Sequence, residues 1–182
     1  NWFFNQWFLD KGHPILEVSW ENKGDSLVLH VHQIQAKDEP TFKLPVEIDV
    51  YFGGKAHRKH IDIENRKEHY FFEGLSGAEA VNFDANKVLL AEIKQTFTPE
   101  EALTLFKKSN NYRTKLEAML QIRGDTSITS WELLNLAAKD SFDSFRKIAL
   151  NFMPAFSDSK TEEHKNFLFK TYNTDSVAAV RS

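Results

Sequence analysis

Seven histidines are the residues of this chain best suited to metal or acid–base chemistry. His30 and His32 stand two positions apart, so a β-strand would place both on one face, where a carboxylate could complete a divalent-metal site. His57 and His60, three apart, would face opposite sides of a strand. His164 follows two glutamates but has no second histidine four residues later, so the zinc pattern HExxH is absent. A solvated strand face is the commoner setting for His30 and His32, and the sequence assigns no catalytic, cofactor-binding or metal-binding residue.

Other sequence patterns for catalysis are absent or have a structural explanation. The chain contains no GxGxxG, P-loop or GxSxG sequence. Gly53 and Gly54 lack the following helix that a phosphate cradle needs, and they fit a hairpin turn instead. The absence of cysteine excludes disulfides, Cys-ligated zinc, iron–sulfur clusters and thiol nucleophiles. The residues taken alone therefore describe scaffold domains without an active site.

The amino-acid composition argues against nucleic acids and membranes as partners of this chain. The chain has 182 residues, a net charge of −3, 41% hydrophobic and 27% charged residues. Lysines and arginines are scattered between acidic residues, which argues against a nucleic-acid groove or binding to an anionic membrane surface. No apolar run approaches the roughly 18 residues of a membrane-spanning helix. A chain without cysteine is compatible with both the cytoplasm and the periplasm, so the compartment stays open.

Residues 15–96 show the period-two pattern of β-strands. The clearest segment is TFKLPVEIDVYF, in which one face is apolar at Phe42, Leu44, Val46, Ile48, Val50 and Phe52. Seven such segments, the last being KVLLAEI at 87–93, alternate with turns rich in Gly, Asn and Asp every 8 to 12 residues or so. We expect an immunoglobulin-like antiparallel β-sandwich over 15–96.

Residues 97–182 change to helical periodicity, which makes the expected fold class α+β multidomain. Thr98 with Glu101 predicts a capping box before the first helix. Ser130 is expected to cap a third helix, and Pro154 to end a fourth that starts near Asp140. The expected helices span 98–109, 114–122, 130–139, 140–153, 161–173 and the unfinished 175–182.

Two helical segments resemble each other. DSFDSFR at 140–146 and DSVAAVR at 175–181 share Asp-Ser, two apolar positions three apart and an arginine after the second. YRTKLEAML is a weaker earlier copy. The offset of 35 residues lies near the repeat length of stacked helix pairs, so we expect a HEAT-like α-helical array, truncated at 182, over 97–182. Coincidence between two capped amphipathic helices is the alternative.

The amino-terminal segment 1–14 is rich in aromatic residues. Five aromatic side chains occur in the first eight positions, spaced so that a helix would carry rings around most of its surface. Gly12 and Pro14 are expected to end that helix. The rings could pack on the rest of this chain, or the segment could be the terminal helix left from an upstream domain.

The spacing of Phe4, Trp7, Gly12 and Pro14 in FNQWFLDKGHP resembles the junction at which the catalytic domain of M1-family zinc aminopeptidases passes into a β-sandwich. The order of a sandwich followed by a HEAT-like helical domain is similar as well. The resemblance covers essentially the whole chain. It identifies the chain as the C-terminal region of such an enzyme.

The resemblance implies a non-catalytic fragment that braces the catalytic domain and walls the substrate cavity. HExxH, a third glutamate ligand and the exopeptidase motif would lie upstream of Asn1, so zinc is expected there and no cofactor in this fragment. The parent would be a metallopeptidase acting on peptides, and Phe3, Phe4, Trp7 and Phe8 would contact its catalytic domain. The alternative is a non-enzymatic protein–protein interaction module. Substrate preference, the parent's zinc ligands and the oligomeric state stay open.

Overall fold

The computed structural model describes residues 2–156 and 161–181. The chain divides into two compact units, Asn1–Thr96 and Phe97–Ser182. The first carries the strands and the second the longer helices. Among the residues described, no helix combines the length and apolar character needed to cross a lipid bilayer.

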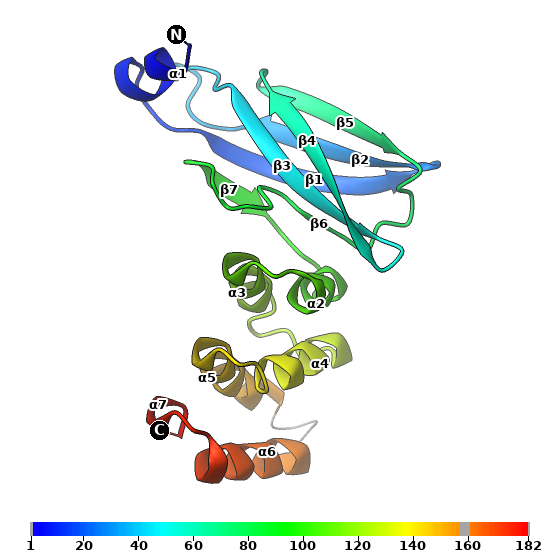
Figure 1. Cartoon of the computed structure of the whole chain (residues 1–182), viewed down its shortest axis with the longest axis vertical. Coiled ribbons are helices and arrows are strands. Elements are labelled where there is room, and N and C mark those ends of the chain that lie inside the picture. Colours follow the sequence, from blue (N-terminus) through cyan, green and yellow to red (C-terminus); the bar gives the residue numbers. More distant parts are fainter. Residues whose placement is uncertain (1, 157–160, 182) are drawn as a thin grey trace. The chain divides into compact units, whose positions relative to one another are not determined.

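The first unit is a sandwich-like arrangement of two sheets (Figure 1). One sheet has four strands in the order β5-β2-β1-β7, namely Lys67–Glu73, Ser26–Gln33, Ile15–Lys23 and Glu92–Gln95. The other has the order β4-β3-β6, namely Lys55–Ile63, Leu44–Phe52 and Ala80–Asn82. Two facing sheets allow each strand to bury one face and expose the other.

The hairpin between β3 and β4 confirms the turn expected at the paired glycines. Gly53 and Gly54 have φ values of 57° and 78°, a backbone region that side chains with a Cβ rarely adopt. Phe52 pairs with Lys55 directly across the turn, and the antiparallel register continues to Leu44 opposite Ile63. A two-residue turn therefore sets the register of the longest hairpin.

The expectation of a wholly antiparallel sandwich is wrong at β7. Ile15 pairs with Glu92 and Val18 with Gln95 in a parallel register. The expected strand at 87–93 is wrong too, because the Asp84 carboxylate accepts hydrogen bonds from the N–H groups of Val88 at 3.1 Å and Leu89 at 3.0 Å. These bonds hold the backbone in a loop, and the strand begins only at Glu92.

The core of the first unit lies between the two sheets. Its buried side chains come from alternate positions of the strands, as the period-two pattern predicts. They include Leu16, Val18, Leu27, Leu29, Val31, Phe42, Leu44, Val46, Ile48, Val50, Ile61, Ile63, Val81 and Phe83. The predicted inward face of β3 is therefore confirmed, with Phe52 only partly buried at its end.

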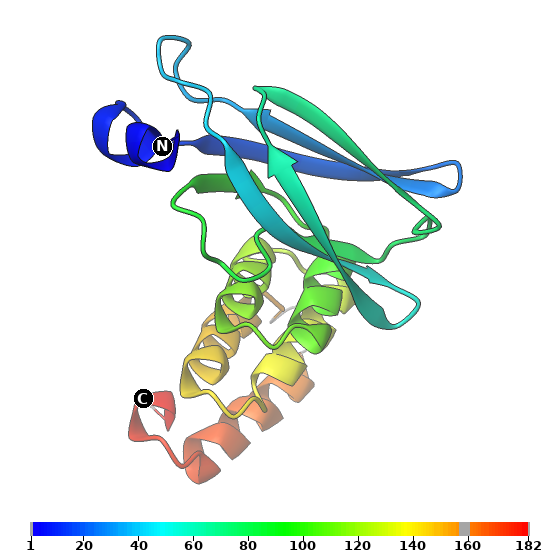
Figure 2. The ribbon, with the colours of Figure 1, turned by 45° about the horizontal axis from the view of Figure 1, so that its top comes forward.

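The second unit is a set of helices packed on one another (Figure 2). Helix α2 packs on α3 and α4, α4 packs on α5, and α5 contacts α7. The helices are α2 Pro99–Lys108, α3 Tyr112–Gln121, α4 Ile128–Ala137, α5 Asp143–Phe152, α6 Thr161–Thr174 and α7 Ala178–Arg181. Helix α5 ends at Phe152, and a 3₁₀ turn, Met153–Phe156, follows it and contains Pro154, near the helix end expected there.

The helix caps agree with the sequence in one case and differ in another. Thr98 and Glu101 form the predicted capping box at the start of α2. The cap of α4 is Ser127, whose hydroxyl accepts a hydrogen bond from the Ser130 N–H at 3.2 Å. The assignment of Ser130 as the cap is wrong because this residue is the third residue of α4, in its first turn, and is fully buried.

Candidate functional site

His30 and His32 lie on the same face of β2, as their spacing predicts, but they bind different partners. His30 Nδ1 lies 2.6 Å from Nδ1 of His69 on β5, so one imidazole donates to the other. The opposite nitrogen of His30 faces Glu21 at 3.5 Å, and His32 faces Glu17 at 3.9 Å. A metal site needs several lone pairs directed at one point, whereas these rings are directed at separate neighbours.

His60 on β4 also has local partners. His60 lies between two carboxylates, 2.9 Å from Glu47 and 3.3 Å from Asp62. The hydrogen bond with Glu47 is the largest influence that raises the pKa of His60 above its ordinary value, followed in that direction by Asp62. The side chain of His164 lies outside the described residues. Within residues 2–156 and 161–181, no group of three His, Asp or Glu side chains is placed to hold a metal ion.

The amino-terminal segment presents an aromatic surface. Residues Trp2–Phe4 form one α-helical turn, α1, and Asn5–Leu9 continue as a π-helix (Figure 1). We define the amino-terminal aromatic surface as the exposed side chains Trp2, Phe3, Phe4, Phe8 and Leu9. Phe4 and Phe8 are 55% and 71% exposed, and their ring centroids lie 5.5 Å apart. Contiguous exposed rings of this kind are typical of surfaces that contact a protein, a membrane or a ligand, and they also promote aggregation.

Two residues of the same segment fix it to the sandwich. Gln6 is buried, and its side-chain amide donates to the Lys43 carbonyl at 3.1 Å while its oxygen accepts from the Lys43 N–H at 2.7 Å. Trp7 packs on the fully buried Phe42 with ring centroids 5.8 Å apart. The expected helix end at Gly12 is wrong, because helical geometry ends at Leu9. The segment therefore has one face bound to the sandwich and one aromatic face open.

A shallow cavity adjoins this surface. Its volume is about 370 Å³, and its lining includes Trp2, Pro45 and Ile63 together with the ion pair between Lys43 and Glu64 at 3.1 Å. An apolar surface beside a charged pair suits contact with a protein whose surface carries both apolar and polar groups.

The helical unit has its own chemical feature, a series of cations paired with acids. Arg146 on α5 binds Asp175 with two hydrogen bonds of 2.7 and 2.9 Å, and its side chain is 12% exposed while that of Asp175 is 8% exposed. The guanidinium is the main cause that lowers the pKa of Asp175, and Asp175 in turn raises that of Arg146. A second ion pair lies nearer the start of the helical unit. Lys115 Nζ on α3 lies 3.4 Å from an oxygen of Asp140, which precedes α5.

Sequence reasoning missed several of these residues. No sequence pattern predicted the buried position of Gln6, because a glutamine between aromatic residues is interpreted as an interruption of an apolar run. His69 sits opposite His30 only through the register of β2 and β5. The pairing of Arg146 with Asp175 had a signal, since both belong to the two similar segments at 140–146 and 175–181.

Comparisons with known proteins add a likeness of fold. No protein-family model matches the sequence, and no curated protein matches it. Among solved structures, the chain is similar to aminopeptidase A of Legionella pneumophila, crystallised in complex with aspartic acid. The TM-score is 0.66 at 13% sequence identity. The similarity covers 96% of this chain and 25% of that protein, so this chain spans about a quarter of its length and shares the fold of that part.

Proposed function

We propose that this chain is the non-catalytic C-terminal region of a zinc-dependent, M1-like aminopeptidase. In this proposal the first unit is an immunoglobulin-like sandwich that braces the catalytic domain. The second is the start of a HEAT-like helical domain that walls the substrate cavity. The chemistry of peptide cleavage belongs to a domain upstream of Asn1.

One observation carries the proposal, namely that the likeness to the Legionella aminopeptidase extends over both units of this chain. A single sandwich or a single helical array recurs in many unrelated proteins, and either alone would say little about function. The same two units in the same order, over 96% of the chain, are a more specific combination.

The amino-terminal aromatic surface supplies a second argument. Gln6 and Trp7 hold the segment on the sandwich, so the exposed rings stay at a fixed place on the first unit. Each aromatic side chain buries roughly 150–250 Å² when it is packed. Covering Phe3, Phe4 and Phe8 with a catalytic domain would remove them from water, and Trp7 would link that contact to Phe42 in the sandwich core.

Zinc in this proposal belongs to the upstream domain. A catalytic zinc site takes three protein ligands and keeps one position for water, which the metal activates for attack on the scissile carbonyl. The histidine pair His30 and His69 is engaged in its own hydrogen bond, and among the described residues it belongs to no group of three side chains placed to hold a metal ion. No step of hydrolysis is therefore assigned to residues of this chain.

The test starts from the reading frame upstream of Asn1. We expect it to encode HExxH within a few hundred residues, and the longer product to hydrolyse aminoacyl p-nitroanilides in a zinc-dependent manner that the 182-residue chain lacks. The separately expressed upstream domain should bind this chain, and F4S/F8S should weaken that binding. An upstream sequence without HExxH would remove the peptidase proposal.

A free-standing interaction module is the second candidate, and the same exposed rings favour it. Under this function the amino-terminal aromatic surface binds a separate protein instead of a domain of the same polypeptide. The two candidates differ in the gene, since this one predicts a natural start near Asn1. They also differ in the assay, because under this function the natural protein would show no peptidase activity.

A further inference from the structure

Strand β4 forms one edge of its sheet, and its outer side has no partner strand among the described residues. The two-residue turn makes Phe52 and Lys55 the first hydrogen-bonded pair of the hairpin, and hydrogen-bonded pairs then recur at every second residue. The odd-numbered residues of β4 therefore direct their N–H and C=O groups at β3. The even-numbered residues direct theirs away from the sheet. Pro45, which has no N–H, accordingly stands opposite an even-numbered residue, Asp62.

The open part of this edge lies toward the turn. At the far end of β4 the outward carbonyl of Asp62 accepts a hydrogen bond of 2.8 Å from the hydroxyl of Tyr70 on β5. The outward N–H and C=O groups of Ala56, Arg58 and His60 have no hydrogen-bond partner among the described residues. An edge of this kind is a template on which another extended chain can pair.

The charged side chains on the even-numbered face of β4 are paired with acids. Arg58 binds the Asp49 carboxylate with two hydrogen bonds of 2.7 Å. His60 lies 2.9 Å from Glu47 and 3.3 Å from Asp62. This face of the strand therefore presents little uncompensated charge to a ligand.

The odd-numbered face carries the uncompensated charge. Five of the six residues 55–60 are lysine, arginine or histidine. Lys55 and Lys59 are exposed, and neither has an ion-pair partner in the part of the chain that the structure describes. His57 lies between them, with a ring nitrogen 3.3 Å from the carbonyl oxygen of Phe52. Two lysines on one face of an open edge favour an anionic partner.

A strand added antiparallel to β4 would meet both features at once. Its residues opposite Ala56, Arg58 and His60 would exchange backbone hydrogen bonds with them. Its residues opposite Lys55 and Lys59 would occupy non-hydrogen-bonded positions, where facing Cβ atoms come within about 4.5–5.5 Å. Acidic side chains at alternate positions of the added strand would therefore face the two lysines.

We propose that the open edge of β4 binds an extended acidic segment of another protein, with acids at every second residue, as an additional antiparallel strand of the β4-β3-β6 sheet. Backbone hydrogen bonds supply the affinity in this mode of recognition, and alternate side chains supply the specificity. A second copy of this chain is a poor occupant, because pairing of two β4 edges would bring the basic side chains of both copies together. The proposal does not rest on the peptidase function.

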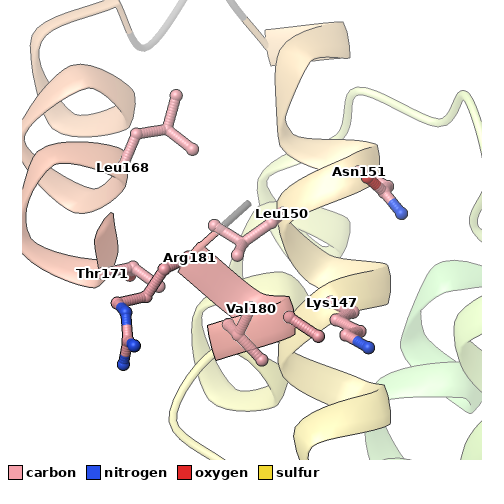
Figure 3. Close-up of a pocket in the computed structure, with 8 residues that line it drawn as sticks. Lys147, Leu150, Asn151, Leu168, Thr171, Val180 and Arg181 are labelled. Atoms are coloured by element: carbon pink, nitrogen blue, oxygen red, sulfur yellow. The ribbon is translucent and has the colours of Figure 1, made fainter. Parts of the chain in front are cut away.

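A second cationic surface, in the helical unit, provides a comparison. Lys147 and Arg181 line a cavity of about 460 Å³, and Leu150 and Leu168 point into the space between α5 and α6 (Figure 3). The backbone of these two helices forms its hydrogen bonds within each helix. A ligand held by charge alone can therefore bind either surface, whereas a ligand that adds a strand can bind only at β4.

The test adds a peptide of about nine residues, in which threonine alternates with glutamate, to the whole chain. We expect amide hydrogen exchange at Ala56, Arg58 and His60 to slow at least tenfold, because these N–H groups gain partners. Methylation of the threonine backbone nitrogens, which would face β4, should weaken binding by about tenfold or more. Methylation of the glutamate backbone nitrogens, which would face away, is the matched control and should change binding by less than about twofold.

Charge variants test the side-chain part of the proposal. Lys55→Gln combined with Lys59→Gln should weaken peptide binding by about fivefold or more and reduce its dependence on salt. Lys147→Gln, at the cationic surface of the helical unit, is the matched control and should leave binding unchanged. The melting temperature of each variant should stay within about 2 °C of the wild type, because all three lysines can be replaced without disturbing the core.

Three results would overturn the proposal. Equal binding of the two methylated peptides would show attraction by charge without strand pairing. Unchanged exchange at Ala56, Arg58 and His60 would leave the lysines as a guard against edge pairing. Slower exchange at these amides that rises with protein concentration, without any peptide, would identify a second copy of the chain as the occupant.

Discussion

Arg146 and Asp175 form a bidentate ion pair, with Nε to Oδ2 at 2.7 Å and Nη2 to Oδ1 at 2.9 Å. The pair connects the first turn of α5 with the turn before α7, 29 residues later in the chain. Arg146 also donates to the carbonyls of Asp140 and Ser141, each at 3.0 Å. One side chain therefore holds two turns of the helical unit together.

Removing Arg146 should destabilise the helical unit. Arg146→Met keeps the length of the side chain but leaves the Asp175 carboxylate in a nearly covered site without its cation, which is costly because an unpaired charge has lost its hydration. We expect the melting temperature of the helical unit to fall by about 5 °C or more. Lys165→Met is the control, since the Lys165–Glu162 pair is 67% and 81% exposed and contributes little. Equal effects of the two variants on the melting temperature would contradict a stabilising role of the Arg146–Asp175 pair.

The same pair predicts a dependence on pH. Arg146 lowers the pKa of Asp175 below its ordinary value of 3.8, so the pair contributes stability above that value and loses it as pH falls through the lower folded-state pKa. The difference in melting temperature between the wild type and Asp175→Asn should be constant above about pH 5 and shrink at more acidic pH. Thermal unfolding between neutral and strongly acidic pH measures it. A difference that does not change with pH would show that the charge is unimportant.

The sequence predicted the features that follow from local periodicity. Val46, Ile48 and Val50 alternate toward the core because a strand has period two, and Thr98 with Glu101 forms its capping box because both partners lie within four residues. The parallel pairing of β7 was missed because no local pattern specifies which strand lies next to it.

The candidate site was predicted in a similar way. The exposed rings at Phe4 and Phe8 carried a clear signal of composition. The bonds from Gln6 to Lys43 carried none, because they join residues 37 positions apart. Ser130 was mistaken for a cap because a serine one turn away, Ser127, offers the same chemistry.

Gln33 is predicted to be essential for the sandwich core. It is 1% exposed, its amide donates to the Phe42 carbonyl at 2.8 Å, and its oxygen accepts from the Phe42 N–H at 2.9 Å. Gln33→Leu would leave both backbone groups of Phe42 unpaired in the core, at a cost of about 2–4 kcal/mol in the free energy of unfolding. Chemical denaturation measures this loss. Lys59→Leu, an exposed strand position, should change it by less than about 0.5 kcal/mol.

The amino-terminal aromatic surface should mediate association without stabilising the fold. Phe4→Ser with Phe8→Ser removes exposed rings, so the chain should bind less of a hydrophobic dye and self-associate less, while its melting temperature stays within about 2 °C. Phe71→Ser is the matched control, because Phe71 is a single ring, 65% exposed, on β5. A large loss of stability in the double variant would show that these rings pack within this chain.

Divalent metals should leave the stability of the chain unchanged. A ligand that binds only the folded state raises the melting temperature, and its stabilisation grows with the logarithm of its concentration relative to its Kd. His30 and His69 share a hydrogen bond through the nitrogens that face each other. Ser19 on β1 pairs with His30, and Lys67 on β5 pairs with His32. The positive charge of Lys67 beside His32 would repel a metal cation bound there. Titration with zinc or copper should therefore shift the melting temperature of the wild type and of His30→Ala equally, by less than about 1 °C. A metal-dependent rise that His30→Ala abolishes would establish a site on this sheet face and return the histidine pair to consideration as functional.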